Sequence, residues 1–183
     1  MGTLDMSMLS RRAAAFVLLT VLAPIASLAQ GPGLGEPISS EELAAWDITI
    51  MPDGSGLPPG SGTAEQGAAI YAQKCVACHG PNGEGGLNAR LVGGEPLTNG
   101  IDTGKTIGNF WPYATTIFDF TRRAMPWLQP RTLTDDEVYA LTAYMLAIND
   151  IIDEDEVMNA ETLPQVQMPN RDGFIPRFPE RMP

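Results

Sequence analysis

The sequence predicts an all-α domain flanked by two extended arms. Two capping boxes, each a Thr followed three residues later by Gln or Glu, mark helix starts at Thr63 and Thr134. In the helix after Thr134, apolar residues recur at the spacing of a buried helix face: Val138, Leu141, Met145 and Ile148. Proline and glycine are frequent on both sides of this helical stretch, where they disfavour long helices and central strands.

The helix that begins at Thr63 is expected to cross the last helix. It places Gly67, Tyr71 and Cys75 on one face, because residues four positions apart lie one above the other on a helix. Glycine is a poor helix former, so a packing reason should keep Gly67 in place. A backbone without a Cβ would let Tyr144 of the last helix approach closely.

Two further helices are expected. One covers residues 112–123, with Pro112 at the first helical position, where proline is favoured. The other is a short helix over residues 40–46 in the N-terminal arm. We therefore divide the chain into a signal peptide (1–29), an extended N-terminal arm (30–62), the helical domain (63–149) and an extended, proline-rich C-terminal arm (150–183).

The first segment has the pattern of a secretory signal. Arg11 and Arg12 precede an apolar run over residues 13–23, and Ser27-Leu28-Ala29 forms a small-residue cleavage pattern. The apolar run stops at Pro24, short of the ~20 residues that a spanning helix needs. We expect export to the periplasm, cleavage near Ala29, and no membrane span after the signal is removed.

The chain without its signal is strongly acidic. It keeps 21 acidic and 9 basic side chains, a formal charge of −12. Such a protein lacks the basic surface that nucleic acid or an anionic membrane requires. The acidity either matches a partner with a basic face or only keeps the protein soluble, and the sequence leaves both interpretations open.

Cys75-Val76-Ala77-Cys78-His79 contains both cysteines and the single histidine of the chain. This spacing is typical of covalent haem attachment, with two thioethers to the porphyrin and the histidine as proximal iron ligand. A zinc site is disfavoured because no further Cys or His exists to complete it. A redox disulfide would be expected beside a βαβ pattern, whereas the flanks here read as helix and glycine-rich loop.

Met125 is the candidate for the sixth iron ligand. Because His79 has no second histidine to accompany it, the remaining options are Met, Lys, a terminal amine, water or a vacant position. Met145 falls on the core stripe of the last helix, and the other methionines lie in the arms. Met125 follows the third helix and precedes Pro126, which ends the helix and leaves the side chain in a loop.

Three motifs resemble those of class I cytochrome c: Gly67-x3-Tyr71-x3-Cys75-x2-Cys78-His79, Met125-Pro126, and Leu141-x2-Tyr144-Met145. The resemblance covers residues 63–149. It implies a single class I cytochrome c domain with one covalently attached haem c, ligated by His79 and Met125, that transfers electrons. Arg122 and Arg123 either pair with haem propionates or occupy an ordinary helix C-terminus, where arginine is favoured.

Further segments resemble the cytochrome subunits that accompany sulfite-oxidase-type molybdoenzymes, in particular the SoxD type of sulfane dehydrogenase. They are Trp46-Asp47-Ile48, the glycine-rich 53–62, 107–113, 122–127 and 168–174. This likeness implies two partners: a molybdopterin-dependent sulfite or sulfane dehydrogenase subunit, and a downstream cytochrome or oxidase.

The chain departs from these families in two ways. Many class I cytochromes have a proline after the haem motif whose carbonyl orients the proximal imidazole, and Asn88-Ala89-Arg90 stands in that stretch here. Full-length SoxD subunits also carry a second haem domain, whereas this sequence has one Cys-x-x-Cys-His.

The preferred hypothesis is a non-catalytic electron-transfer subunit. A stand-alone diffusible cytochrome of another respiratory chain is one alternative, and a haem enzyme such as a peroxidase is another. A peroxidase needs an open distal site, against which Met125 argues. The long proline-rich arms favour a partner-bound protein, in which they act as binding straps. The arms could instead pack around their own domain or be disordered.

Overall fold

The computed structural model describes residues 34–97, 103–175, 177 and 178. The expected signal segment lies outside these residues. The described chain forms two compact units, one ending at Trp46 and one beginning at Asp47. No helix in the described ranges is long and apolar enough to cross a bilayer.

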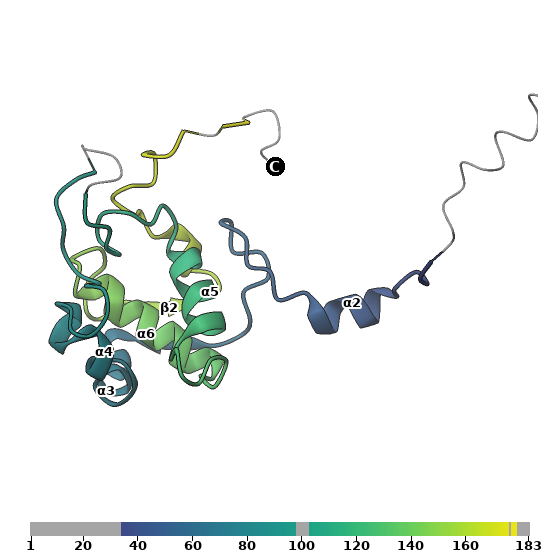
Figure 1. The fold of residues 1–183 in the computed structure, drawn as a ribbon, viewed down its shortest axis with the longest axis horizontal. Helices are drawn as coiled ribbons and strands as arrows, with labels where there is room; N and C mark the ends of the chain where they lie inside the picture. Colours follow the sequence, from purple (N-terminus) through teal and green to yellow (C-terminus); the bar gives the residue numbers. More distant parts are fainter. Residues whose placement is uncertain (1–33, 98–102, 176, 179–183) are drawn as a thin grey trace, which may run out of the picture. The chain divides into compact units, whose positions relative to one another are not determined.

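The structure confirms the predicted helical fold (Figure 1). The first unit contains α2 (Ser40–Trp46), as expected for residues 40–46. The second contains α3 (Ala64–Lys74), α4 (Val76–His79), α5 (Ala114–Ala124) and α6 (Asp135–Ala147). Two short 3₁₀ turns, η2 (Pro81–Gly83) and η4 (Leu163–Gln165), complete the helical elements.

Both predicted capping boxes form. The Thr63 hydroxyl accepts from the Gln66 amide, and the Gln66 side chain accepts from the Thr63 amide at 3.0 Å. The same pair of bonds joins Thr134 and Glu137 at the start of α6. Each box satisfies amide groups that have no partner inside the helix, which fixes where α3 and α6 begin. α5 begins two residues later than predicted, because Tyr113 is its N-cap and Pro112 lies outside it.

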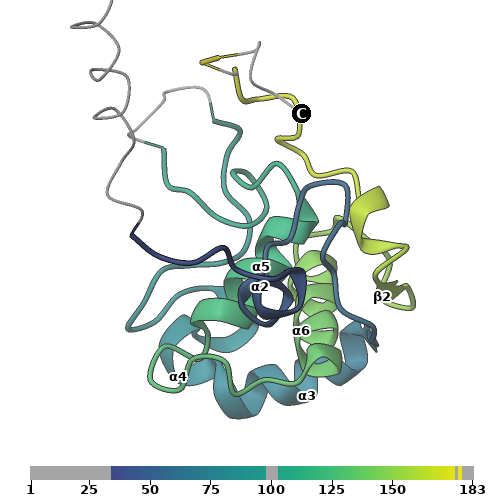
Figure 2. The same ribbon diagram turned by 90° about the vertical axis from the view of Figure 1, so that its right-hand side faces the viewer.

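α3 crosses α6 at Gly67, as the sequence predicted (Figure 2). A Cβ on Gly67 would lie 2.0 Å from the Ala140 carbonyl oxygen and 2.7 Å from the Tyr144 Cβ. The rings of Tyr71 and Tyr144 pack with centroids 5.1 Å apart. The missing side chain therefore allows the two helix backbones to touch, and the aromatic pair lies beside this contact.

Replacing Gly67 by Ala is expected to destabilise the domain. Alanine improves helix propensity by up to about 1 kcal/mol, but the added carbon meets backbone atoms that cannot move aside, and such overpacking costs about 1–3 kcal/mol or more. The cost of the clash should exceed the gain in helix propensity, so Gly67→Ala should unfold at a lower denaturant concentration than the wild type. Gly104→Ala is the control, because a Cβ there meets nothing within 4 Å. Equal stability of the two variants would contradict the close crossing.

A small antiparallel sheet was not predicted. β1 (Ser61–Thr63) pairs with β2 (Val157–Asn159), with Gly62 opposite Met158. The three-residue strands are too short to show an alternating pattern. β1 packs on α6, since a Cβ on Gly62 would lie 2.2 Å from the Ala140 amide nitrogen. The sheet thereby holds the segment before α3 and the segment after α6 against α6.

The chain after α6 packs on its own domain as far as residue 171. Four of its apolar side chains are buried in the core beside Phe118 and Tyr139: Met158, Leu163, Val166 and Met168. Asn170 Nδ2 then donates to the Phe110 carbonyl, and the Arg171 guanidinium lies over the Tyr113 ring. The sequence left open whether the C-terminal arm binds a partner, packs around its own domain or is disordered. Residues 158–171 pack around their own domain.

The chain before α3 is also attached, from Ile48 onward. Arg123 Nη2 donates to the Ile48 carbonyl, and the Tyr139 hydroxyl donates to the Pro58 carbonyl. The Ser61 amide donates to Asp136 Oδ1. The compact domain is therefore longer at both ends than the predicted 63–149.

Removing residues 158–183 is expected to abolish cooperative folding. The deletion takes away four buried side chains worth about 1.5–3 kcal/mol each, a loss comparable to the whole stability of about 5–15 kcal/mol of a typical domain. Removing only residues 174–183 takes away the half-exposed Phe174 ring that packs on Phe110, and should change the free energy of unfolding by about 1.5 kcal/mol or less. Thermal unfolding followed by circular dichroism distinguishes the two, and a cooperative transition in the longer deletion would contradict the burial.

Candidate haem site

The haem-attachment motif lies at the break between α3 and α4. Cys75 ends α3 with a non-helical backbone, and its carbonyl accepts from the amides of Cys78 at 3.1 Å and His79 at 3.0 Å. These bonds wind Cys75, Cys78 and His79 into one helical turn. Two thiols and an imidazole are thus brought together on one short element, as the sequence predicted.

The loop after α4 folds back over this turn. The Gly85 amide donates to the His79 carbonyl, and the Asn88 amide donates to the Cys78 carbonyl, each at 2.8 Å. The loop then places the Ala89 carbonyl oxygen 2.8 Å from His79 Nδ1. A carbonyl can only accept, so Nδ1 carries the hydrogen and Nε2 is the nitrogen with a free lone pair.

The Ala89 carbonyl therefore makes the contact with the histidine ring that a proline carbonyl makes in many class I cytochromes. Such a bond to the ring N–H fixes the orientation and tautomer of an imidazole ligand and raises its basicity. Sequence reasoning left this acceptor unassigned. No side-chain signal could have found it, because every residue type carries the same carbonyl group.

Gly80 and Tyr71 hold the turn and the loop together. Gly80 has a φ of 74°, and a Cβ there would lie 2.1 Å from the Gly85 carbonyl oxygen. The buried Tyr71 hydroxyl donates to the Gly80 carbonyl at 3.0 Å. Burial raises the pKa of Tyr71 to about 12, so this hydroxyl keeps its hydrogen at neutral pH.

Cys75 and Cys78 are free thiols in the structure. No disulfide joins Cys75 and Cys78. Burial raises the pKa of the Cys75 thiol to about 11, whereas reactive redox cysteines have a lowered pKa. Within the described ranges, no cluster of three or more His, Cys, Asp or Glu side chains could hold a metal ion on its own.

Met125 lies on a separate segment. α5 ends at Ala124, and Met125 follows as its C-cap with an extended backbone, its amide donating to the Thr121 carbonyl. The side chain is half-buried, and no hydrogen bond of the described residues engages its sulfur. A thioether with free lone pairs is a suitable soft ligand for haem iron.

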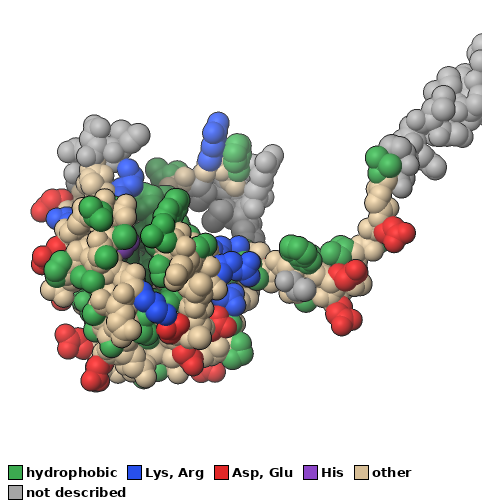
Figure 3. All heavy atoms as spheres, turned by 60° about the horizontal axis from the view of Figure 1, so that its bottom comes forward, with side chains coloured by type: hydrophobic (Ala, Val, Ile, Leu, Met, Phe, Trp, Pro, Cys, Tyr) green, Lys and Arg blue, Asp and Glu red, His purple; other side chains and the backbone are tan. Residues whose placement is uncertain are grey.

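The surroundings of the motif fit a porphyrin. Large apolar side chains next to the motif and to Met125 are strongly exposed: Leu87 at 87%, Trp127 at 74% and Leu128 at 88%. Figure 3 shows the histidine, in purple, beside a hollow bounded by hydrophobic side chains. Exposed apolar surface around a hollow indicates a binding site for an apolar group. Two thiols, a free Nε2 and a free thioether supply the attachment points and ligands.

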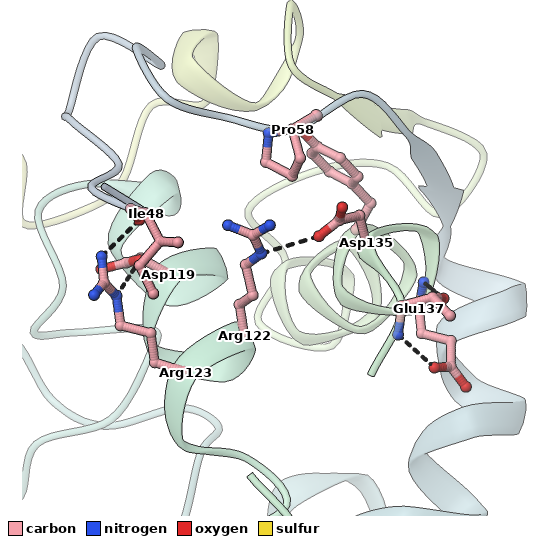
Figure 4. Close-up of polar contacts among 9 residues, drawn as sticks. Ile48, Pro58, Asp119, Arg122, Arg123, Asp135 and Glu137 are labelled. Carbon is pink, nitrogen blue, oxygen red and sulfur yellow. Dashed lines mark hydrogen bonds and ion pairs between the residues drawn. The ribbon is translucent and has the colours of Figure 1, made fainter. Parts of the chain in front are cut away.

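Arg122 and Arg123 are engaged with carboxylates of the protein (Figure 4). Arg122 Nε pairs with Asp135 Oδ1 at 2.9 Å, and Arg123 Nε pairs with Asp119 Oδ1 at 2.6 Å. Both sit at the C-terminal end of α5, where positive charge is favoured. The two arginines therefore lie at a helix terminus, and their pairing with haem propionates stays a prediction.

Comparison with known proteins identifies the family of the chain. The family model described as cytochrome c oxidase, cbb3-type, subunit III matches residues 62–145. A chain in the crystal structure of the sulfane dehydrogenase SoxCD from Paracoccus pantotrophus is 39% identical, with a TM-score of 0.73. That alignment covers 82% of this chain and 75% of the other. The chain thus belongs to the cytochrome c family, and within it resembles the SoxD-type cytochromes of sulfane dehydrogenases.

Proposed function

We propose that the protein is a periplasmic mono-haem cytochrome c that accepts electrons from a sulfite-oxidase-type molybdoenzyme during the oxidation of sulfur compounds. It would pass them to a downstream cytochrome or oxidase. The observation that carries the proposal is the similarity to a SoxCD chain, which extends over 82% of this chain and so beyond the haem domain alone.

Four side chains would hold the haem. Cys75 and Cys78 would bind it through thioethers, and His79 Nε2 and the Met125 sulfur would be the axial ligands. The haem supplies one-electron redox chemistry at the iron. The chain itself positions the groups around it: the Ala89 carbonyl holds the imidazole, and the exposed apolar side chains Leu87, Trp127 and Leu128 would exclude water from the porphyrin faces.

The segments before residue 47 and after residue 173 expose apolar side chains, although the Phe174 ring also packs against Phe110 with centroids 5.5 Å apart. Apolar side chains are exposed before residue 47 (Leu34, Ile38, Leu43 and Trp46) and after residue 173 (Phe174, Ile175 and Phe178). Isolated exposed apolar residues are ordinary, but runs of them at the ends of an acidic chain suit binding to another protein. We infer that any strap consists of these outer segments, since residues 157–171 belong to the core.

Two measurements test the proposal. The secreted protein should begin at Gln30 by mass spectrometry and show one covalent c-type haem per chain in a pyridine haemochrome assay. It should also be recovered together with a molybdenum-containing dehydrogenase, and deletion of residues 174–183 should weaken that association while the haem spectrum stays unchanged. A haem-free protein would refute the cytochrome assignment, and enzyme-like turnover of peroxide would favour the haem-enzyme alternative.

A further inference from the structure

An arginine-lined cavity lies at the C-terminal end of α5, the helix that precedes Met125. It has a volume of about 140 Å³, is partly open to solvent, and is lined by the end of α5, the loop before α6, the first residue of α6 and Ile48. Three of its six lining residues are Arg122, Arg123 and Arg131. The whole chain has 11 basic residues against 22 acidic ones, so this gathering of positive groups runs against the overall charge. In Figure 3, Lys and Arg side chains likewise gather at one edge of the domain.

The carboxylates around the cavity orient two of the arginines without using all of their donors. Asp135 accepts from Arg122 Nε, and Asp119 accepts from Arg123 Nε. Arg123 Nη2 donates to the Ile48 carbonyl at 2.7 Å. Figure 4 shows the Arg122 guanidinium held by the Asp135 contact, with its two terminal nitrogens directed away from that carboxylate. No hydrogen bond within the described ranges uses these nitrogens, so Arg122 retains unused donors.

Arg131 supplies a positive charge that has no carboxylate partner in the described part of the chain. Its backbone has a φ of 62°, in the left-handed region that costs a non-glycine residue about 1–2 kcal/mol. Asn and Gly adopt this conformation more readily, so local folding alone gives no reason for arginine here. Strained residues of this kind are concentrated at ligand-binding positions. Arg131 lines the cavity together with Arg122 and Arg123.

We propose that this cavity binds a small tetrahedral oxyanion of the sulfate class. A cavity of about 150 Å³ accommodates a benzene-sized ligand, so the volume here admits a five-atom oxyanion. Planar guanidinium groups donate paired hydrogen bonds to oxyanions, and several of them can surround the four oxygens of one ion. Asp135 and Asp119 are already paired with Arg122 and Arg123, so the Arg131 charge is left to offset one of the two negative charges of a sulfate-class anion.

The choice of a sulfur oxyanion rests on the proposed function, because oxidation of sulfur compounds generates anions of this class. The preference for a tetrahedral anion rests only on the cavity. Binding of sulfate by the isolated cytochrome involves no electron transfer. A protein that binds sulfate but receives no electrons from a molybdoenzyme would therefore refute the function and leave the anion site intact.

The test is calorimetric titration of the haem-loaded protein with sulfate at constant ionic strength. Arg131→Asn removes the charge with a residue that tolerates the left-handed backbone, and we expect it to weaken sulfate binding about tenfold or more. Arg177→Asn is the matched control, since it loses the same charge in the C-terminal tail and should bind as the wild type does. Arg131→Lys keeps the charge but loses the paired donors, and should bind with intermediate affinity.

Two results would overturn the proposal. One is equal sulfate affinity in the wild type and Arg131→Asn, with both proteins showing the same helical circular dichroism. The other is acetate binding as tightly as sulfate at the same ionic strength, which would assign the cavity to a carboxylate, such as an acidic side chain of a partner, rather than to a free tetrahedral ion.

Discussion

Replacing Cys75 and Cys78 together by Ala is expected to abolish covalent haem attachment and to leave the domain without a stable fold. The exposed apolar side chains Leu87, Trp127 and Leu128 gain burial only when a porphyrin covers them. The free energy of unfolding of a typical domain is only about 5–15 kcal/mol, so a bound group that stabilises only the folded form has a large effect. Denaturing electrophoresis with haem staining and near-ultraviolet circular dichroism measure the two losses.

Ala77→Ser is the matched control for the double variant. Ala77 lies in the same turn, is exposed, and carries neither thiol, so its replacement should preserve both the haem stain and the native spectrum. A cooperative unfolding transition and a native spectrum in the double variant would show that the protein core alone suffices for folding.

Met125→Ala is expected to remove the near-infrared charge-transfer band of a methionine-ligated haem and to lower the reduction potential. Thioether ligation raises the potential of haem iron relative to nitrogen or oxygen ligands. Axial ligands set haem potentials over a range of about 0.8 V, so a fall on the order of 0.1 V is expected. Optical spectroscopy and potentiometric titration of the purified protein give the two values.

Two other methionines serve as controls for Met125. Met51→Ala changes an exposed loop side chain, and Met145→Leu conserves volume at a buried position of α6. Both should retain the band and the potential. A band that survives Met125→Ala and disappears in one of the controls would reassign the sixth ligand.

The helices and the haem motif could be predicted because their signals are local. The capping boxes at Thr63 and Thr134 fixed the starts of α3 and α6 to the residue. Gly67 predicted the helix crossing because a poor helix former in mid-helix needs a packing reason, and the close contact with Ala140 supplies it. Cys75, Cys78 and His79 meet because they occupy one turn, which requires no knowledge of the tertiary fold.

The packing of the C-terminal segment could not be predicted in the same way. Pro164 and Pro169 predicted an extended arm and left open whether it packs on its own domain, and the structure shows Met158, Leu163, Val166 and Met168 buried. Proline excludes helix and central strand, but it does not prevent an irregular segment from burying alternate side chains against helices that lie elsewhere in the sequence. The pairing of β1 with β2 depends on the same tertiary contacts.

The acceptor for His79 and the position of Arg131 could not be predicted from the sequence either. The acceptor for His79 Nδ1 is the backbone carbonyl of Ala89, and its position depends on how the loop folds back through Gly85 and Asn88. In the sequence, nothing distinguishes Arg131 from an ordinary charged residue of a loop. Its left-handed backbone and its place beside Arg122 become apparent only in three dimensions.

The most direct test of the electron-acceptor claim is rapid mixing of the oxidised protein with the molybdenum subunit of a sulfane or sulfite dehydrogenase and its sulfur substrate. Haem reduction is followed by the rise of the visible absorption bands. We predict complete reduction, with one electron taken up per chain and no reduction when the molybdenum subunit is left out. A haem that dithionite reduces at once, but that stays oxidised in the presence of the working molybdoenzyme, would contradict the account.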